Sequence, residues 1–472
     1  MNWRAPEYAD APALLQSPRM GDEQRASAAR EEPAGLTPRS TIRGSLRAPG
    51  SKSLAQRALL IAGLCDGETR IAGLPNGADV AAAVRVLGQV GASPRQLAPA
   101  ALAVRGRPPS LHSSWHCDRP LEVGESGTLA RFALAILGFC GQPGGHESVR
   151  ATGTLAARSS APLLDALERG GVRFARRAWP IELTPIGPPS SVVLRDPCSS
   201  QEASALAIAL CAWPDENELR IEGELPSRPY FEMTLRVLEH FGARVRRSAD
   251  AVSETLLLRG PLRAPPDPFA IEPDASLAAV ALAAGCLSGG EVAATGFGST
   301  SLQGDVAIVE HLRAFGCRAL ARGGALVASG FPQHGAQLDL GRQPDLAPVL
   351  AIVAAGAALL STGGESVLRG LETLPGKESS RIAVLAEGLR RAGWRARESE
   401  RELWIGAPDF ERLTAPIELD PHGDHRMVFA FALLGLLRPG VRVLDSSCVA
   451  KSWPGFWRDL GALDCRAAAN LG

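Results

Sequence analysis

Apolar residues recur in runs along this 472-residue chain, at a spacing of about 70–80 residues. Each run follows a short polar or glycine-containing segment. Such a segment predicts a helix start, because small polar residues cap helices and Pro or Gly ends the preceding element. The pattern therefore predicts six copies of one unit. The six helix starts are Ser51-Lys52-Ser53, Gly124-Glu125-Ser126-Gly127-Thr128, Ser199-Ser200-Gln201, Pro273-Asp274-Ala275-Ser276, Pro344-Asp345 and Gly423-Asp424-His425-Arg426.

Within each unit, the apolar helix is followed by a turn, a short strand and a second, more amphipathic helix. The second helices are predicted at residues 79–90, 162–169, 230–241, 305–315, 380–392 and 454–460. One or two further strands close most units, as at residues 255–259, which gives a βαβαββ-type α/β unit. The first helices, such as 347–360, are apolar nearly all round and are predicted to be buried. Six units then favour two domains of three units, with buried helices inside and sheets around them.

Ionisable residues gather at the predicted helix starts and in the adjoining loops. If the buried helices run parallel, each domain presents several positive helix N-termini to one face, and two such faces form a cleft that attracts anions. Eight cations there predict a ligand of high negative charge, because Arg and Lys bind carboxylate and phosphate groups. They are Lys52, Arg57, Arg131, Arg158, Lys377, Arg381, Arg426 and Lys451.

Three acids, Asp345, Glu378 and Glu125, lie among these cations. An acid in such a cluster is either a paired structural ion or a general acid/base, and the pattern alone leaves both roles open. A structural scaffold built on the same repeat would not need Lys and Arg at its helix starts. The pattern therefore favours a protein that binds an anion.

The composition narrows the class of protein. The 50 Lys and Arg residues balance the 50 Asp and Glu residues, which argues against nucleic-acid binding through bulk charge. The nine cysteines form no C-x-x-C pair, and His112 and His116 lack a further ligand pattern, so no disulfide framework or metal site is predicted. No apolar run is long enough to span a membrane, and residues 1–39 are predicted to be a flexible tail without a secretory signal. We expect a cytoplasmic protein.

Several short segments follow one another in a specific order. They are Pro49-Gly50-Ser51-Lys52-Ser53 with Arg57, Ser126-Gly127-Thr128 with Arg131, Ser199-Ser200-Gln201, Ser227-Arg228-Pro229-Tyr230, Gln303-Gly304-Asp305, Pro344-Asp345, Lys377-Glu378-Ser379-Ser380-Arg381, Asp424-His425-Arg426-Met427 and Ala450-Lys451. Each is weak alone, but together, at spacings that fit the six units, they are highly specific. In this respect the chain resembles the EPSP synthase family of enolpyruvyl transferases, over residues 40–463.

The resemblance implies an inverse α/β fold with two barrel-like domains of three units, in agreement with the repeat. Domain II would comprise residues 51–272, inserted into a domain I made of residues 40–50 and 273–472. It implies an enzyme that joins shikimate 3-phosphate to phosphoenolpyruvate and releases phosphate, in the shikimate pathway to chorismate and the aromatic amino acids. No cofactor or metal, no nucleic acid and no membrane is implied, and a monomer is expected.

The resemblance also assigns residues to the two substrates. Shikimate 3-phosphate would be held by Lys52, Ser53, Arg57, Ser199, Ser200, Gln201, Ser227, Tyr230, Asp345 and Lys377. Phosphoenolpyruvate would be held by Lys52, Gly127, Thr128, Arg131, Arg158, Gln201, Arg381, Arg426 and Lys451. We assign Asp345 to the 5-hydroxyl and Glu378, acting with Lys52, to the methylene carbon. The reverse assignment stays open, and His425 either orients or shares a proton or is purely structural.

Three positions depart from the family's pattern. Glu125 stands where the family usually has Asn, Thr373 lies near where an Asn often contacts the shikimate ring, and Ser159 replaces a Pro. A carboxylate at position 125 would oppose an anionic substrate unless it pairs with Lys52 or Arg131 or is protonated.

Two related functions stay as alternatives. One is an enolpyruvyl transferase that acts on a UDP-sugar. Such enzymes have a reactive Cys loop and a Lys-Asn pair, and this sequence shows neither, since Ser53 follows Lys52. The other is an inactive relative that binds phosphorylated cyclitols without turnover. The presence of Asp345, Glu378 and all eight cations disfavours it.

Overall fold

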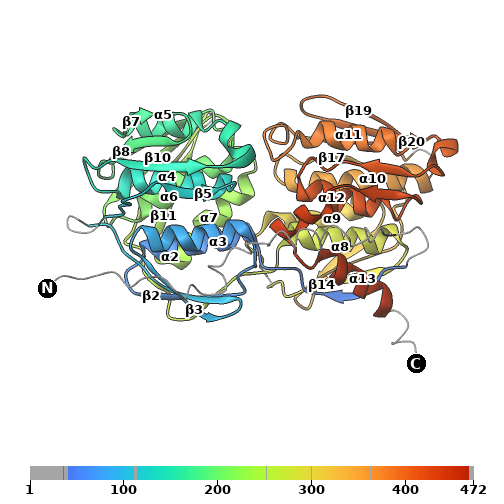
Figure 1. Cartoon of the computed structure of the whole chain (residues 1–472), viewed down its shortest axis with the longest axis horizontal. Coiled ribbons are helices and arrows are strands. Elements are labelled where there is room, and N and C mark those ends of the chain that lie inside the picture. The colour runs from blue at the N-terminus through green and yellow to red at the C-terminus, as the bar shows by residue number, and fades with distance from the viewer. Residues whose placement is uncertain are drawn as a thin grey trace, which may run out of the picture.

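The computed structural model describes Leu36 and residues 41–110, 114–250, 252–298, 300–361 and 364–466, with side chains up to residue 463. The tail predicted at residues 1–39 lies almost entirely outside the described residues, as does His112. Figure 1 shows two lobes side by side, the first coloured blue to green and the second yellow to red. No described helix is long and apolar enough to cross a membrane.

Each lobe is built around three helices that are buried on nearly all sides. They are Lys52–Leu64 (α2), Gly127–Cys140 (α4) and Ser200–Cys211 (α6) in the first lobe, and Ala275–Leu287 (α8), Ala347–Leu360 (α10) and His425–Leu434 (α12) in the second. All 13 residues of α8 are buried, as expected for a helix without a polar face. The helices form two clusters of buried side chains, one from residues 54–271 and one from residues 42–48 and 275–463. We call these parts the first and second lobes; the domain boundaries at residues 50 and 273 stay a prediction.

The second helix of each unit buries only one side. These helices are Ala78–Gln89 (α3), Ala161–Arg169 (α5), Arg228–His240 (α7), Ile308–Ala314 (α9), Arg381–Arg391 (α11) and Phe456–Arg466 (α13). The helix predicted at residues 305–315 is wrong at its start, because Gly304–Ala307 forms a 3-10 turn (η2) before α9. The other 3-10 turns are Gly153–Ala157 (η1), Pro344–Leu346 (η3), Phe410–Leu413 (η4) and Ser446–Lys451 (η5).

Four-stranded sheets surround the helices, and in each the first strand runs parallel to the second while the others are antiparallel. In spatial order, the first-lobe sheets are Phe269–Ala270 (β13), Glu68–Ala72 (β2), Ala101–Arg105 (β4), Ser93–Ala98 (β3); Leu121–Gly124 (β5), Glu147–Ala151 (β6), Ile181–Thr184 (β8), Arg173–Arg176 (β7); and Ser191–Arg195 (β9), Glu216–Glu222 (β10), Ser253–Arg259 (β12), Arg244–Ala249 (β11). The second-lobe sheets are Arg43–Leu46 (β1), Glu291–Thr295 (β14), Ala325–Ser329 (β16), Arg318–Arg322 (β15); Gln337–Asp339 (β17), Ser366–Arg369 (β18), Leu403–Pro408 (β20), Trp394–Glu398 (β19); and the two strands Ile417–Leu419 (β21) and Val441–Val443 (β22).

Two features of these sheets depart from a plain repeat. The last sheet has only two strands among the described residues, because the chain continues from β22 into η5 and α13. Strand β1 pairs with β14 of the second lobe, whereas β13 pairs with β2 of the first lobe. The chain therefore passes between the lobes twice, before α2 and after β13. These two crossings join the lobes at the edge from which the inner helices start.

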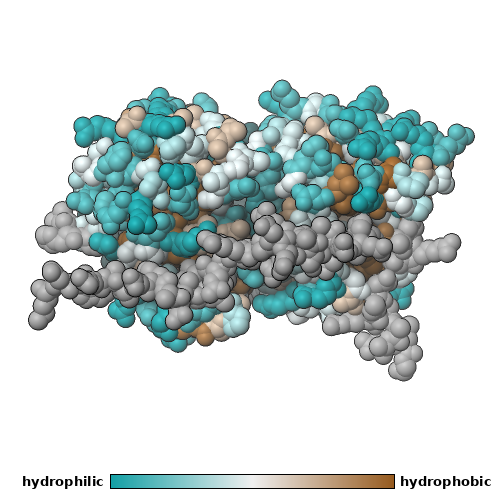
Figure 2. Space-filling view, viewed as in Figure 1, coloured by the Kyte–Doolittle hydropathy of each residue, from teal (hydrophilic) through white to brown (hydrophobic). Residues whose placement is uncertain are grey.

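The inner helices begin where the lobes face each other. Residues at the starts of α2, α4 and α6 line one pocket together with Asp345 of η3, which leads into α10. Arg426, in the first turn of α12, contacts the same Asp345. Elsewhere the visible described surface of both lobes is mostly hydrophilic (Figure 2). The fold thus directs several positive helix ends toward one gap.

Candidate active site

Helix α2 begins at a cap and a half-buried cation. Ser51 Oγ accepts a hydrogen bond from the Leu54 amide at 3.4 Å and caps the helix. Lys52 Nζ pairs with Asp79 Oδ2 at 3.0 Å. Burial opposes the charged form of Lys52, but the carboxylates of Asp79 and Glu378 outweigh burial and raise the pKa of Lys52. Lys52 therefore stays protonated in the cleft.

A small pocket lies beside Lys52, with walls from both lobes. It is lined by Ser53, Arg57, Thr128, Ser199, Ser200, Gln201, Ser227, Tyr230, Asp345 and Lys377. Nine of these ten residues were predicted to hold shikimate 3-phosphate, and Thr128 was predicted on the phosphoenolpyruvate side. Of the predicted shikimate 3-phosphate residues, Lys52 is the one outside this lining. Hydroxyl, amide, carboxylate and cationic groups from six segments of the sequence thus face one space.

Arg57 is almost fully buried in the wall of this pocket, with 1% of its surface exposed. Its Nε donates to Thr234 Oγ1 at 2.7 Å, Nη1 to the Ser53 carbonyl at 2.8 Å, and Nη2 to the Tyr230 carbonyl at 3.1 Å. None of these three acceptors is charged, and burial lowers the pKa of Arg57 to about 10. A buried guanidinium without a carboxylate among these partners has an unsatisfied demand for negative charge.

Gln201 connects the starts of α4 and α6. Its Oε1 accepts from Arg131 Nη1 at 3.0 Å, and its Nε2 donates to Thr128 Oγ1 at 3.0 Å. Arg131 also donates to the carbonyls of Gly127 and Ser159, and burial lowers the pKa of Arg131. A Cβ at Gly127 would lie 3.0 Å from Arg131 Nη1. Glycine at this position therefore allows the guanidinium to fold back over the helix start.

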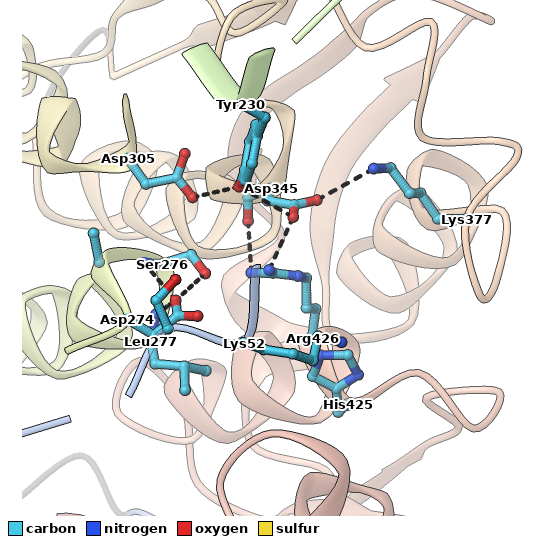
Figure 3. A network of polar contacts seen from close by, with 12 residues as sticks. Lys52, Tyr230, Asp274, Ser276, Leu277, Asp305, Asp345, Lys377, His425 and Arg426 are labelled. Carbon is cyan, nitrogen blue, oxygen red and sulfur yellow. Dashed lines mark hydrogen bonds and ion pairs between the residues drawn. The ribbon is translucent and has the colours of Figure 1, made fainter. Parts of the chain in front are cut away.

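Asp345 is the centre of the cation cluster on the second lobe. Its Oδ1 lies 3.0 Å from Arg381 Nη1 and 3.6 Å from Lys377 Nζ, and its Oδ2 lies 2.9 Å from Arg426 Nη2. Figure 3 shows Lys377 and Arg426 reaching this carboxylate from different sides. Burial alone would favour the protonated acid, but Arg426, Lys377 and Arg381 hold the pKa of Asp345 well below its usual range. Asp345 is thus ionised, and its cationic partners make it a weak base.

Glu378 is held by a second set of partners. Its Oε1 lies 3.0 Å from Lys451 Nζ, and its Oε2 lies 3.0 Å from His425 Nδ1. Burial is outweighed by His425, Lys451 and Lys52, which hold the pKa of Glu378 well below its usual value. Burial lowers the pKa of His425, although Glu378 opposes that shift.

Glu378, Asp424 and His425 are the one group among the described residues whose ligand atoms lie close enough together to hold a metal ion. Two of these acids already have cationic partners, because Arg381 Nε lies 2.8 Å from Asp424 Oδ2 and Lys451 pairs with Glu378. Asp424 also caps α12 through the Arg426 amide at 2.9 Å. These contacts give the three residues a role without a metal.

Two of the three residues that depart from the family pattern, Glu125 and Ser159, contact cations of the site. Glu125 Oε2 lies 3.5 Å from Lys451 Nζ, so the pairing expected with Lys52 or Arg131 is replaced by one with Lys451 across the gap. Arg158 donates to Thr154 Oγ1 at 2.8 Å, and within the described part of the chain its side chain forms no hydrogen bond or ion pair with another predicted site residue. Ser159 accepts from Arg131 through its carbonyl, which does not depend on its side chain. Arg158 is therefore the predicted phosphoenolpyruvate residue whose side chain has the weakest connection to the other cations of the site.

Three acids of the site were missed by the sequence analysis as site residues. Asp79 pairs with Lys52, Asp424 with Arg381, and Asp305 accepts from the Tyr230 hydroxyl at 2.9 Å. Asp305 and Asp424 stand inside segments that the resemblance was built on, so their position was visible but their contacts were not. Asp79, in the first turn of α3, carried no signal beyond an acid at a helix start.

Comparison with solved structures agrees with the predicted fold class. The EPSP synthase from Acinetobacter baumannii has a TM-score of 0.71 at 22% identity, covering 91% of this chain and 97% of that one. The enolpyruvyl transferase NikO from Streptomyces tendae has a TM-score of 0.67 at 18% identity, covering 91% and 96%. At these identities the likeness concerns the fold alone.

Proteins related in sequence identify the family more specifically than the solved structures do. The 3-phosphoshikimate 1-carboxyvinyltransferase from Ralstonia pickettii (strain 12J) is 31% identical over 446 residues, covering 90% of this chain and 98% of that protein. The protein of the same name from Sodalis glossinidius (strain morsitans) is 32% identical over 444 residues, covering 92% and 98%. The model of the EPSP synthase (3-phosphoshikimate 1-carboxyvinyltransferase) family matches residues 36–460. The resemblance is confirmed, and the chain belongs to the EPSP synthase family.

Proposed function

We propose that this chain transfers the enolpyruvyl group of phosphoenolpyruvate to the 5-hydroxyl of shikimate 3-phosphate and releases phosphate. Family membership supports the reaction. The observation that carries the assignment of substrates to this chain is the pocket that joins Arg57 and the hydroxyls of the first lobe to Asp345 and Lys377 of the second lobe. It offers anion-binding groups on one side and a carboxylate on the other.

Shikimate 3-phosphate binds in this pocket. Its phosphate meets Arg57 and the helix-start hydroxyls, because these supply positive charge and donors without a competing carboxylate. Its ring lies toward Tyr230, and its 5-hydroxyl lies toward Asp345. The low pKa of Asp345 keeps it ionised, and it becomes a base strong enough to accept the hydroxyl proton once phosphoenolpyruvate draws its cationic partners away.

Phosphoenolpyruvate binds beside it, among Lys52, Arg131, Arg158, Arg381, Arg426 and Lys451. Arg131 and Arg158 have pKa values lowered by burial, so an anion there relieves unfavourable desolvation. Gly127, Thr128 and Gln201 complete this side through the helix start of α4 and the Gln201 amide. An anionic substrate brings Lys451 a partner other than Glu378.

The two acids act on opposite atoms of the reaction. The 5-hydroxyl attacks C2 of phosphoenolpyruvate while C3 gains a proton; the tetrahedral intermediate then loses phosphate and a methyl proton, which restores the double bond. Asp345 takes the hydroxyl proton. Glu378 accepts the methyl proton, and Lys52 together with Glu378 supplies the proton to C3. His425 holds the Glu378 carboxylate in place at 3.0 Å.

The test is a coupled phosphate-release assay with shikimate 3-phosphate and phosphoenolpyruvate, followed by identification of the enolpyruvyl ether. A UDP-sugar in place of shikimate 3-phosphate serves as the control acceptor. Phosphate release with the UDP-sugar alone, or substrate binding without turnover, would contradict the proposal.

We extend the proposal to a cytoplasmic monomer. All the groups of the pocket come from one chain, and each of the eight cysteines with a described side chain is a free thiol. Specific activity that is constant over a wide range of protein concentration, together with a monomer mass in solution, is the expected result. Activity that depends on assembly would contradict it.

A further inference from the structure

The Tyr230 hydroxyl lies between two carboxylates of the second lobe. It is 2.9 Å from Asp305 Oδ2 and 3.4 Å from Asp345 Oδ2 (Figure 3). Tyr230 belongs to α7 of the first lobe, Asp305 to η2 and Asp345 to η3. The hydroxyl therefore crosses the gap between the lobes. It has one proton and can donate it to one carboxylate at a time.

The two carboxylates differ sharply in their surroundings. Asp345 has three cationic partners, whereas Asp305 is 4% exposed and its carboxylate accepts a single side-chain hydrogen bond among the described residues, from Tyr230. Asp305 Oδ1 is buried and has no hydrogen-bond partner among the described residues. A buried carboxylate with one donor is poorly stabilised in its ionised form.

The groups that shift the charge of Asp305 come from four elements, η3, α7, α8 and α12. Asp345 of η3 and Asp274 at the start of α8 disfavour its charge, while Arg426 of α12 and the Tyr230 hydroxyl of α7 favour it. Burial and Asp345 dominate and raise the pKa of Asp305 to about 7. Asp305 therefore exchanges its proton near neutral pH.

We propose that Asp305 is a positioning residue that acts through Tyr230: its protonation state decides whether the Tyr230 hydroxyl donates to Asp305 or to Asp345. When Asp305 is ionised, it accepts the hydrogen bond of the Tyr230 hydroxyl, and Asp345 Oδ2 keeps Arg426 as its partner. When Asp305 is protonated, its own O–H donates to the Tyr230 oxygen, and Tyr230 donates to Asp345. Only hydrogen bonds are exchanged between these two states; no covalent bond to the substrate is involved.

The consequence for catalysis rests on the role proposed above for Asp345. A hydrogen bond donated by Tyr230 occupies one acceptor position of Asp345 and lowers its affinity for the substrate's hydroxyl proton. Turnover should then rise with pH as Asp305 loses its proton. Asp305→Asn donates through its amide to the Tyr230 oxygen and so fixes the arrangement of the protonated acid at every pH.

We call this exchange of hydrogen bonds among Asp305, Tyr230 and Asp345 the relay. It can be observed without any substrate. The chain contains two tyrosines, Tyr8 and Tyr230, so labelling tyrosine at Cζ with an NMR-active carbon isotope gives two signals, and Tyr230→Phe identifies the second. We expect the Tyr230 signal to titrate with a midpoint near pH 7, because the phenol changes from donating to an anion to bridging two acids. In Asp305→Asn this titration should disappear.

Turnover gives the second readout. In the wild type, kcat/KM for shikimate 3-phosphate should rise about tenfold from pH 5.5 to about pH 8. In Asp305→Asn the rise should be lost and the value should stay near the low-pH level of the wild type. The matched control is Glu147→Gln, a buried carboxylate that lies beyond the C-terminal end of α4 and pairs with His116; this variant should keep the wild-type profile.

The outcomes separate the relay from the proposed reaction. If the Tyr230 signal does not titrate in the wild type, or titrates unchanged in Asp305→Asn, the relay is overturned whatever the activity. Should Asp305→Asn fail to fold, Asp305→Ser repeats the comparison. A wild-type Tyr230 signal that does not titrate would overturn the relay without any variant. An enzyme inactive toward shikimate 3-phosphate but with the expected titration would keep the relay and remove the proposed reaction.

Discussion

The two faces of the gap bind charge in different ways. On the first lobe, Arg57 and Arg131 donate to hydroxyl, amide and carbonyl oxygens, and burial lowers the pKa of both. On the second lobe, Arg381 and Arg426 are each paired with carboxylates at 3.0 Å or less, and their pKa values are raised despite burial. Arg57 and Arg131 on the first face therefore donate to neutral partners and can still bind an anion, whereas Arg381 and Arg426 on the second face are already neutralised by carboxylates.

This difference indicates that the two faces bind an anionic substrate in different ways. Arg57 and Arg131 of the first face can receive a phosphate monoester without releasing a carboxylate, because their hydrogen-bond partners are neutral. On the second face an incoming anion competes with Asp345 and Glu378 for the same cations. The loss of those partners raises the proton affinity of the acids at the moment when they are needed for proton transfer.

The largest effect is expected from Glu378→Gln. The amide cannot exchange a proton, so kcat should fall about a thousandfold while both KM values change little, since general acid–base groups contribute on that order. Steady-state kinetics measure it. Glu372→Gln, on the loop before Glu378 and paired only with Arg401 at the surface, is the matched control. Unchanged kcat in Glu378→Gln would remove this acid from the mechanism.

A pair of Arg→Lys variants compares the two faces directly. Arg57→Lys should raise KM for shikimate 3-phosphate about thirtyfold, because Lys cannot reproduce the three-way contact of the guanidinium. Arg426→Lys should instead raise KM for phosphoenolpyruvate by about the same factor. If both variants affect both substrates equally, the proposed separation of the faces is wrong.

The pH dependence of stability depends on Asp305. Its pKa of about 7 in the folded protein lies above that of an exposed Asp, so its contribution to stability is present at low pH and is lost as pH rises through 7. Asp305→Asn removes this loss. Relative to the wild type, the variant should gain about 2 kcal/mol between about pH 5.5 and about pH 8. Denaturant unfolding at the two pH values measures the change, and an equal difference at both would contradict the raised pKa.

The smallest effect is expected from Ser51→Ala. The substitution removes the cap of α2 and should lower the free energy of unfolding by about 1 kcal/mol, with unchanged KM for both substrates if the helix start keeps its position. Ser45→Ala, in the exposed strand β1, is the control for a serine without a capping role. A large loss of substrate affinity in Ser51→Ala would mean that the cap positions Lys52 as well.

The sequence determined the repeated unit and the identity of the charged groups. Apolar runs such as residues 347–360 have no polar face, so they can only be buried, and the polar segment before each one can only be its start. The motif order then led to the family, which the comparisons confirm. Residue-level roles stay predictions, although the pocket contains most of the residues assigned to one substrate.

Tertiary structure alone decided which charges meet. Asp79 lies 27 residues after Lys52, and Asp305 lies 75 residues after Tyr230, so no local period links them. Their contacts depend on how two lobes face each other and on which carboxylate is buried without a cation. Periodicity reports which side of an element is apolar, but the pairing of ionisable groups depends on distances between elements, and these are set only when the whole chain has packed.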